Sequence, residues 1–274
     1  MNRRETIRYL VAGGVAAAVL PGQALAAHHR SVTRVGVQLF TVRDQMSKDV
    51  AATLAAVAEV GYQEVETAGT GNLDAVQFAT ALADAGLTAP AAHVPINLLR
   101  DQPQNLLETA DIIGYRYLVV PWLPPDMRTT GGYAAAIDTL NAFGELSAQA
   151  GIQTCYHNHA FEFESVDGAI PFDVMLENCD PELVKFELDL YWARHAGADA
   201  LGYLQRAPER FPLCHVKDRT AAGEMTEIGS GDIDFPELFA AGTGLRHYFV
   251  EHDRPEDSMA SIRRSFRAVS AMRF

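Results

Sequence analysis

The feature that most constrains this chain is a strand-like segment followed by a helix-like segment, repeated eight times. Strand–helix alternation of this kind predicts a parallel sheet. Eight units in about 250 residues favour a closed (β/α)8 barrel, the TIM barrel, as a single domain. The third segment is the weakest, because Pro90 interrupts it. The predicted strands are Arg34–Phe40, Tyr62–Glu66, Leu87–His93, Tyr115–Pro121, Ile152–Asn158, Leu183–Leu190, Phe211–Lys217 and His247–Glu251.

Helical patterns rich in alanine and leucine lie between the strands. We expect helices at Asp49–Val60, Asn72–Ala85, Tyr133–Ala150 and Glu256–Met272, with Gly151 ending the third of these. An open, doubly wound sheet is the alternative. It is disfavoured because "QLFTVRDQ", at the end of the first strand, contains no glycine for a phosphate-binding loop. The long irregular segment Asp218–Ile233 is expected to form a loop over the barrel mouth.

The first 26 residues have the pattern of a cleavable signal peptide, which leaves residues 27–274 for the barrel. A basic start precedes the apolar run "YLVAGGVAAAVL", and small residues follow it. That run is too short to span a bilayer, which needs about 20 residues. The pair Arg3-Arg4 favours twin-arginine export over the general secretory route, and an N-terminal helix is the third interpretation. We therefore expect an exported, periplasmic protein.

The chain is acidic, with a formal net charge of −13 over 274 residues. The signal segment carries a net +2, so the mature chain has −15. This charge argues against nucleic acid and against anionic membranes as partners. The three cysteines, Cys155, Cys179 and Cys214, are too few for a disulfide framework and are expected to be buried thiols. The sequence leaves open whether the protein forms a homo-oligomer.

Acidic and basic side chains cluster at the ends of six predicted strands. Active sites of such barrels lie at the carboxyl ends of the strands, and alternate strand residues share a face. One such residue alone is usually structural, but six strand ends together predict a site. Mixed imidazole and carboxylate ligands suit Mn²⁺, Zn²⁺, Co²⁺ or Fe²⁺ better than Mg²⁺ or Ca²⁺. The residues are Glu64 and Glu66, His93, His157 and His159, Glu187 and Asp189, His215 and Lys217, and Glu251 and Asp253.

Lys217 has two interpretations. It is either a structural ion paired with Asp218 or Glu251, or a site residue that holds a substrate oxygen. The chain has only three lysines, which favours the site.

Several motifs resemble those of the sugar phosphate isomerase/epimerase family of xylose-isomerase-like TIM barrels. They are "VGVQLFTVRD", "GYQEVE", "YHNHAFEF", "ELDLYW", "HVKD", "IGSGDIDF" and "YFVEHD", in the family's order along the mature chain. The resemblance implies one divalent metal ion bound by Asp189, His215 and Glu251 together with the residue that ends the fifth strand. That residue is usually a glutamate, but this chain has His157 there. A symmetric epimerisation by two glutamates is therefore not expected.

The resemblance implies a metal-dependent isomerase, epimerase or β-eliminating lyase that removes a proton next to a carbonyl. Export, and the lack of an arginine cluster, favour a non-phosphorylated sugar or keto-sugar. Glu251 is the expected base, and His157 or His159 the second acid/base. Lys217, Gln38, Glu66, His93 and Trp122 are the expected substrate contacts. The alternatives are a non-catalytic periplasmic carbohydrate-binding barrel and an endonuclease of damaged DNA, which the acidic charge disfavours.

Overall fold

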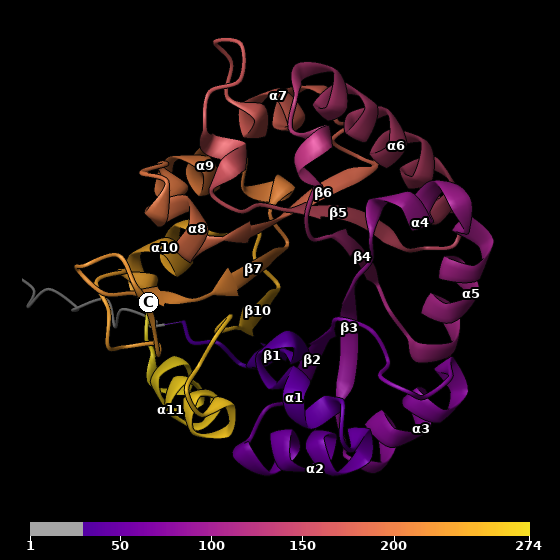
Figure 1. The fold of residues 1–274 in the computed structure, drawn as a ribbon. Helices are drawn as coiled ribbons and strands as arrows, with labels where there is room; N and C mark the ends of the chain where they lie inside the picture. The colour runs from indigo at the N-terminus through magenta and orange to yellow at the C-terminus, as the bar shows by residue number, and fades with distance from the viewer. Residues whose placement is uncertain (1–29) are drawn as a thin grey trace, which may run out of the picture.

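The computed structural model describes residues 30–274, so the predicted signal peptide lies outside the described residues. Eight parallel strands form a closed barrel in the order β1-β10-β7-β6-β5-β4-β3-β2, surrounded by helices (Figure 1). The strands are β1 (Gly36–Gln38), β2 (Glu64–Thr67), β3 (Thr88–His93), β4 (Tyr117–Val120), β5 (Gln153–His157), β6 (Val184–Asp189), β7 (Leu213–Val216) and β10 (His247–Val250). Because β1 pairs with both β2 and β10, the sheet is closed and the open-sheet alternative is wrong.

The helices connect successive strands on the outside of the barrel (Figure 1). They are α1 (Arg43–Met46), α2 (Val50–Val60), α3 (Ala75–Asp84), α4 (Ile96–Asp101), α5 (Pro103–Ile113), α6 (Thr130–Gln149), α7 (Pro171–Asn178), α8 (Leu190–His195), α9 (Ala200–Arg206), α10 (Phe235–Ala241) and α11 (Ser258–Ala271). All four predicted helices are confirmed as α2, α3, α6 and α11, with ends shifted by a few residues. Within residues 30–274, no helix combines the length and the apolar content needed to cross a membrane.

Local sequence signals explain the ends of two helices. The Asp49 side chain accepts a hydrogen bond from the backbone N–H of Ala52, so Asp49 is the N-cap of α2 and not its first residue. Gly151 follows α6 with φ +72°, a conformation that favours glycine. The predicted break at Pro90 does not occur: Pro90 lies inside β3, and the pairing of β2 with β3 shifts register beside it.

The segment Asp218–Ile233 folds back on itself instead of covering the barrel mouth. It forms a short antiparallel hairpin, β8 (Asp218–Arg219) with β9 (Met225–Thr226). The Asp218 carboxylate accepts hydrogen bonds from the backbone N–H groups of Gly229 and Gly231, both at 2.9 Å. Asp218 therefore holds the loop and does not pair with Lys217. The loop touches the rim of the mouth at Met225, whose Sδ is 3.2 Å from the backbone nitrogen of Asp253.

An apolar plug fills the barrel below the polar strand ends. Its residues are fully buried and come from five strands: Ala91, Val119, Cys155, Leu213 and Phe249. Gly36 faces the largest of them, since a Cβ at this position would lie 2.5 Å from the Phe249 ring. The three cysteines are buried free thiols, as predicted. The plug closes the barrel from below, so that ligands can reach the polar side chains only from the carboxyl end.

Replacing Phe249 with alanine should lower the free energy of unfolding by about 3–5 kcal/mol, because the plug would keep a cavity. Phe40 is a matched control, since its ring is 42% exposed at the rim, and Phe40→Ala should change stability by only about 0.5 kcal/mol. Denaturant unfolding of both variants measures the difference. Equal losses would contradict the role of the plug.

Candidate active site

A cavity of about 380 Å³ opens at the carboxyl ends of the strands. Of the ten side chains to which the sequence analysis gave a role, six line the cavity: His93, Trp122, His157, His159, Lys217 and Glu251. The other four, Gln38, Glu66, Asp189 and His215, are fully buried. They lie beneath the cavity and contact its lining residues or one another. Gln38 donates to Glu66 (2.7 Å), and Asp189 lies 2.9 Å from Lys217. The structure thus brings the predicted residues together, but it places Gln38 and Glu66 under the floor, not on the wall.

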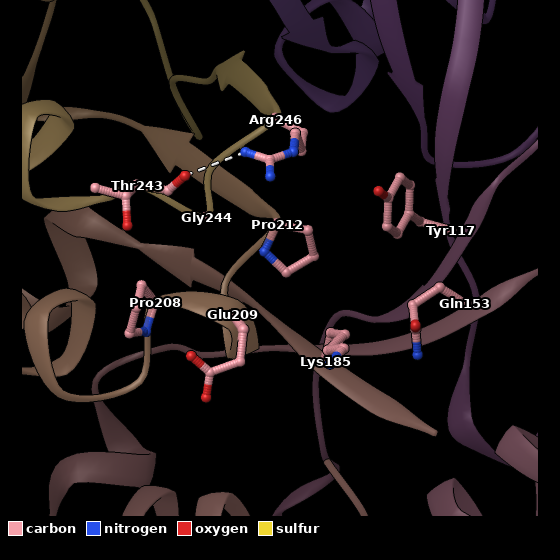
Figure 2. Close-up of a pocket in the computed structure, with 9 residues that line it drawn as sticks. All are labelled: Tyr117, Gln153, Lys185, Pro208, Glu209, Pro212, Thr243, Gly244 and Arg246. Atoms are coloured by element: carbon pink, nitrogen blue, oxygen red, sulfur yellow. Dashed lines mark hydrogen bonds between the residues drawn. The ribbon is translucent and has the colours of Figure 1, made fainter. Parts of the chain in front are cut away.

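A second cavity, of about 410 Å³, lies at the opposite end of the barrel (Figure 2). Tyr117 and Gln153, which begin β4 and β5, contribute to its lining, together with Lys185 and Arg246. None of the predicted site residues reaches it. Because catalysis in such barrels takes place at the carboxyl ends of the strands, the first cavity is the candidate site.

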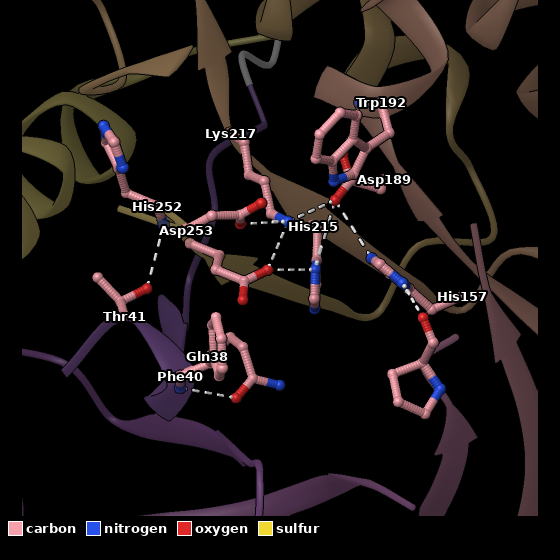
Figure 3. A network of polar contacts seen from close by, with 12 residues as sticks. Gln38, Phe40, Thr41, His157, Asp189, Trp192, His215, Lys217, His252 and Asp253 are labelled. Atoms are coloured by element: carbon pink, nitrogen blue, oxygen red, sulfur yellow. Dashed lines mark hydrogen bonds and ion pairs between the residues drawn. The ribbon is translucent and has the colours of Figure 1, made fainter. Parts of the chain in front are cut away.

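Lys217 contacts three carboxylates at the cavity floor (Figure 3). Its Nζ lies 2.9 Å from Asp189 Oδ2, 2.7 Å from Glu251 Oε2 and 2.9 Å from Asp253 Oδ1. Burial alone would lower the pKa of Lys217, but these carboxylates raise it well above its usual value. Burial would likewise raise the pKa of Glu251, but Lys217 and His215 hold it well below its usual range. Lys217, Asp189 and Glu251 are therefore charged at neutral pH, whereas burial raises the pKa of Asp253. Lys217 is both an ion-pair residue and a lining residue.

His157 is held in one tautomer. Its Nδ1 is 3.1 Å from the backbone oxygen of Pro121, which can only accept, so Nδ1 carries the ring hydrogen. Burial and the neighbouring His215 lower the pKa of His157 to about 4, so the ring is neutral at pH 7 and Nε2 has no hydrogen. Nevertheless, Nε2 lies 3.2 Å from Asp189 Oδ2. Burial would raise the pKa of Asp189, but the Lys217 ammonium holds it well below its usual value, so Asp189 is ionised. Two lone pairs face each other, which is the arrangement of two ligands of one cation.

The residues after His157 fix the position of Asp189 and of the following loop. Strand β5 ends at His157. The strand therefore does not continue to His159, as it would have to if His157 and His159 shared a strand face. The His159 ring still lines the cavity, and burial lowers its pKa, which keeps it neutral. Asn158 Oδ1 accepts the backbone N–H of Asp189 at 2.9 Å, which ties β5 to β6. Glu162 accepts the backbone N–H of His159 at 2.8 Å.

Below these residues, farther from the cavity, two imidazoles and two carboxylates form a closed ring of short contacts. We call it the inner set: Glu66, His93, Glu187 and His215. His93 Nε2 lies 3.2 Å from Glu66 Oε2 and 3.0 Å from Glu187 Oε2. His215 Nε2 lies 2.7 Å and 3.2 Å from the same two oxygens. Burial would lower the pKa of His93, but Glu66 and Glu187 raise it to about 9.

Two groups of side chains can therefore hold a metal ion. One is the inner set, and the other, the outer set, consists of His157, Asp189 and His215. Glu251 adjoins the outer set, since its Oε2 lies 2.8 Å from His215 Nδ1. This contact is not a hydrogen bond, because Nδ1 has no hydrogen-bond partner within residues 30–274. His215 belongs to both sets through different ring nitrogens.

The sequence analysis listed Glu187 and Asp253 among the strand-end side chains but gave neither a specific role, and it gave none to Asn158. Glu187 and Asp253 were recognisable, since each shares a strand face with a predicted site residue, Asp189 and Glu251 respectively. Asn158 was visible only as the middle of "HNH", because its hydrogen bond joins two strands that are distant in sequence. Phe40 also lines the cavity, from the 3-10 turn Leu39–Val42 after β1.

Replacing Lys217 with methionine should destabilise the metal-free protein by about 3–5 kcal/mol at pH 7, because buried carboxylates lose their counter-ion. Folding stabilises Asp189 and Glu251 as anions, so their contribution is present above about pH 4 and is lost as the pH falls through the folded pKa values of these two groups. The loss in the variant should therefore shrink in acid. Denaturant unfolding at several pH values tests this. Lys185→Met is the control, since the Lys185 ammonium binds only a backbone oxygen, at 2.5 Å. A loss independent of pH would contradict the ion-pair account.

Comparison with known proteins agrees with this fold. Residues 54–241 match the family described as xylose isomerase-like TIM barrel. An inosose dehydratase of Geobacillus thermodenitrificans is 27% identical over 145 residues, which are 46% of this chain and 48% of that protein. The chain thus spans about half the length of the curated relatives it matches.

Solved structures show the same fold. A sugar phosphate isomerase/epimerase from Parabacteroides distasonis superposes with a TM-score of 0.76 at 23% identity, covering 90% of this chain and 96% of that one. The IolI protein with a bound zinc atom gives a TM-score of 0.69 at 14% identity, covering 86% and 96%. With more than half of its residues matched, this chain belongs to the xylose isomerase-like TIM barrel family.

Proposed function

We propose that this protein is a divalent-metal-dependent isomerase, epimerase or β-eliminating lyase acting on a non-phosphorylated sugar or keto-sugar through an enediolate. The observation that carries the proposal is the outer set, where the lone pair of His157 Nε2 faces the Asp189 carboxylate beside a substrate-sized cavity. The dehydratase and isomerase names of the relatives support a reaction that begins with loss of a proton next to a carbonyl.

The outer set fits one divalent metal ion. His157 Nε2, His215 Nδ1 and Asp189 Oδ2 offer two nitrogens and one oxygen, with Glu251 as a fourth ligand, and this mixture suits Mn²⁺, Zn²⁺, Co²⁺ or Fe²⁺. The backbone oxygen of Pro121 orients His157 from its other nitrogen, as partners of metal-bound histidines do. When bound, such an ion polarises a carbonyl and stabilises negative charge on its oxygen. The zinc atom bound by the IolI protein supports this assignment.

Glu251 is the proposed base. It lines the cavity and is ionised, but the ammonium of Lys217, 2.7 Å away, makes it a weak base in the resting protein. A substrate oxygen that accepts a hydrogen bond from Lys217 would draw the ammonium away from the carboxylate. Glu251 would then become more basic at the moment when a proton must be removed. Lys217 would meanwhile stabilise the charge that develops on the substrate oxygen.

His159 is the proposed second acid/base. His157 cannot serve, because its Nδ1 hydrogen is bound to Pro121 and its Nε2 is a ligand in the proposed site. His159 is a neutral imidazole at the cavity wall, and its Nδ1 has no hydrogen-bond partner within residues 30–274. Its ring N–H can donate a hydrogen bond to a substrate oxygen or to a departing group, and it would transfer a proton only after taking one up at its other ring nitrogen.

The cavity lining favours a sugar without a phosphate. Trp122 and Phe40 are 43% and 42% exposed at the rim, where aromatic rings can pack against the C–H face of a sugar. No arginine contributes to the lining within residues 30–274, and Lys217, its one ammonium group, is held by three carboxylates. This distribution of charge also disfavours a nucleic acid substrate. A carbohydrate-binding barrel without catalysis remains the second candidate, favoured by His157 in place of a glutamate.

Replacing Glu251 with glutamine should abolish exchange of solvent deuterium into the substrate, because the amide cannot take a proton. Metal-loaded protein would be incubated in D₂O with free sugars and 3-keto-glycosides, and NMR would report exchange, epimerisation or elimination. Glu64→Gln is a matched control, since Glu64 lies on the same barrel but binds Arg34 and His247 at the other end of β2. Exchange that persists in Glu251→Gln would exclude Glu251 as the base. Its absence in the wild type with every sugar would favour the binding-only candidate.

We also propose export to the periplasm by the twin-arginine route, on the basis of the N-terminal sequence. Replacing Arg3 and Arg4 with lysines keeps the charge but removes the paired arginines. Cell fractionation should then find the protein retained in the cytoplasm with its signal segment uncleaved. Unchanged export would indicate the general secretory route.

A further inference from the structure

We propose that the inner set is a second binding site, for a divalent transition-metal ion held entirely by protein ligands. This site shares His215 with the outer set that serves the proposed chemistry but uses the other ring nitrogen, and the proposal does not depend on that chemistry. It lies below the cavity floor, where Glu66, Glu187 and His215 are fully buried and only His93 reaches the cavity.

The geometry of the ring is the first argument. Imidazole nitrogens alternate with carboxylate oxygens, and the four N···O edges measure 2.7, 3.0, 3.2 and 3.2 Å. Ligands at ~2.0–2.1 Å from a tetrahedral zinc ion lie roughly 3.3–3.4 Å apart. The four N···O edges therefore need to lengthen by only a few tenths of an ångström to match the ligand spacing of such a site. All four ligand atoms already lie within 4.8 Å of one another.

Hydrogen bonding alone does not satisfy the ring, which is the second argument. Each Nε2 carries at most one hydrogen, so at most two hydrogens are available for four N···O contacts. Glu66 Oε2 also accepts a hydrogen bond from Gln38 Nε2 at 2.7 Å. The other oxygens, Oε1 of Glu66 and Oε1 of Glu187, are buried without a hydrogen-bond partner within residues 30–274. Buried carboxylate oxygens rarely remain unpaired, and each is free to join a cation in bidentate fashion.

Charge balance is the third argument. An imidazole binds a metal ion only in its neutral form, and with both rings neutral the two glutamates carry −2 at a fully buried position. A divalent cation would cancel this charge in place of the ring protons that balance it in the metal-free protein. Binding replaces the hydrogen on each Nε2 by a metal–nitrogen bond, and the displaced protons go to solvent. Two nitrogens and two oxygens suit Zn²⁺, Co²⁺ or Fe²⁺ better than Mg²⁺ or Ca²⁺.

The inner site would have a structural role. Four protein ligands leave no open position for substrate, as in structural zinc sites. The ion would fix the His215 ring with Nδ1 directed toward Glu251 and Asp189. His215 could then reach an ion in the outer set only as an imidazolate, so occupancy of the two sites is coupled.

Metal counting in variants tests the proposal without relying on activity. The purified chain would be stripped with a chelator and dialysed against Zn²⁺, and the bound zinc per chain measured by mass spectrometry. Asp189→Asn, which removes an outer ligand, should keep one zinc per chain. Adding Glu66→Gln and Glu187→Gln to that variant should remove this zinc. Glu64→Gln, on the same strand as Glu66, is the control that should leave the zinc content unchanged.

A cobalt spectrum provides a second readout. Co²⁺ in the Asp189→Asn variant should give the intense visible bands of four-coordinate cobalt, and His93→Gln should alter them, because His93 belongs only to the inner set. Circular dichroism checks that each variant folds. If the variant with Glu66→Gln and Glu187→Gln does not fold, His93→Gln takes its place, because His93 is the most accessible ligand of the inner set. The proposal is overturned if folded Asp189→Asn binds no metal, or if its metal survives both inner-set changes. If Asp189→Asn loses deuterium exchange but retains its zinc, both sites are supported. If the wild type shows no exchange at all, the proposed function is contradicted and the inner site is not.

Discussion

The organisation of the site depends on His215, a fully buried imidazole that contacts four carboxylates from three strands: Glu66 of β2, Glu187 and Asp189 of β6, and Glu251 directly after β10. Its Nε2 faces Glu66 and Glu187, and its Nδ1 faces Asp189 and Glu251. A neutral imidazole has one hydrogen, so it cannot donate to acceptors on both sides of the ring at once. The protein therefore either protonates His215 or places a cation on one side of it. Burial disfavours the protonated ring, but Glu187 and Glu251 outweigh burial and raise the pKa of His215 well above its usual value. The site is thus arranged to hold positive charge, whether as protons or as metal ions.

The fold could be predicted from the sequence because eight strand–helix units admit few arrangements. Strand parity then placed the polar strand ends inside the barrel mouth, and His93, Lys217 and Glu251 do line the cavity. Two kinds of detail could not be read this way. Pro90 fits into β3 because the pairing of β2 with β3 shifts register beside it, where the N–H group that proline lacks is not needed for the sheet. The depth of Gln38 and Glu66 below the cavity depends on the tilt and stagger of the strands in the closed barrel, which no local sequence pattern shows.

The string "HNH" shows how far a motif can be interpreted before a structure is known. Its position at a strand end predicted a site, and His157 occupies the position expected for a ligand. The roles of its three residues differ, however. His157 faces Asp189, Asn158 joins the ends of β5 and β6, and His159 turns its ring to the cavity after the strand has ended. Only the hydrogen bonds distinguish these roles.

The exchange of a glutamate for His157 has a consequence for charge. A glutamate here would add a fourth carboxylate beside Asp189, Glu251 and Asp253, with Lys217 as the only ammonium among them. Histidine keeps a ligand atom at the same strand end without adding negative charge. A metal ion in the outer set would then be balanced by Asp189 and Glu251, leaving Lys217 paired with Asp253 and free to donate to a substrate oxygen. The substitution therefore favours a site in which one carboxylate and one ammonium act on the substrate, instead of two opposed carboxylates. Such an asymmetric pair suits elimination or isomerisation better than inversion of a single carbon through both faces.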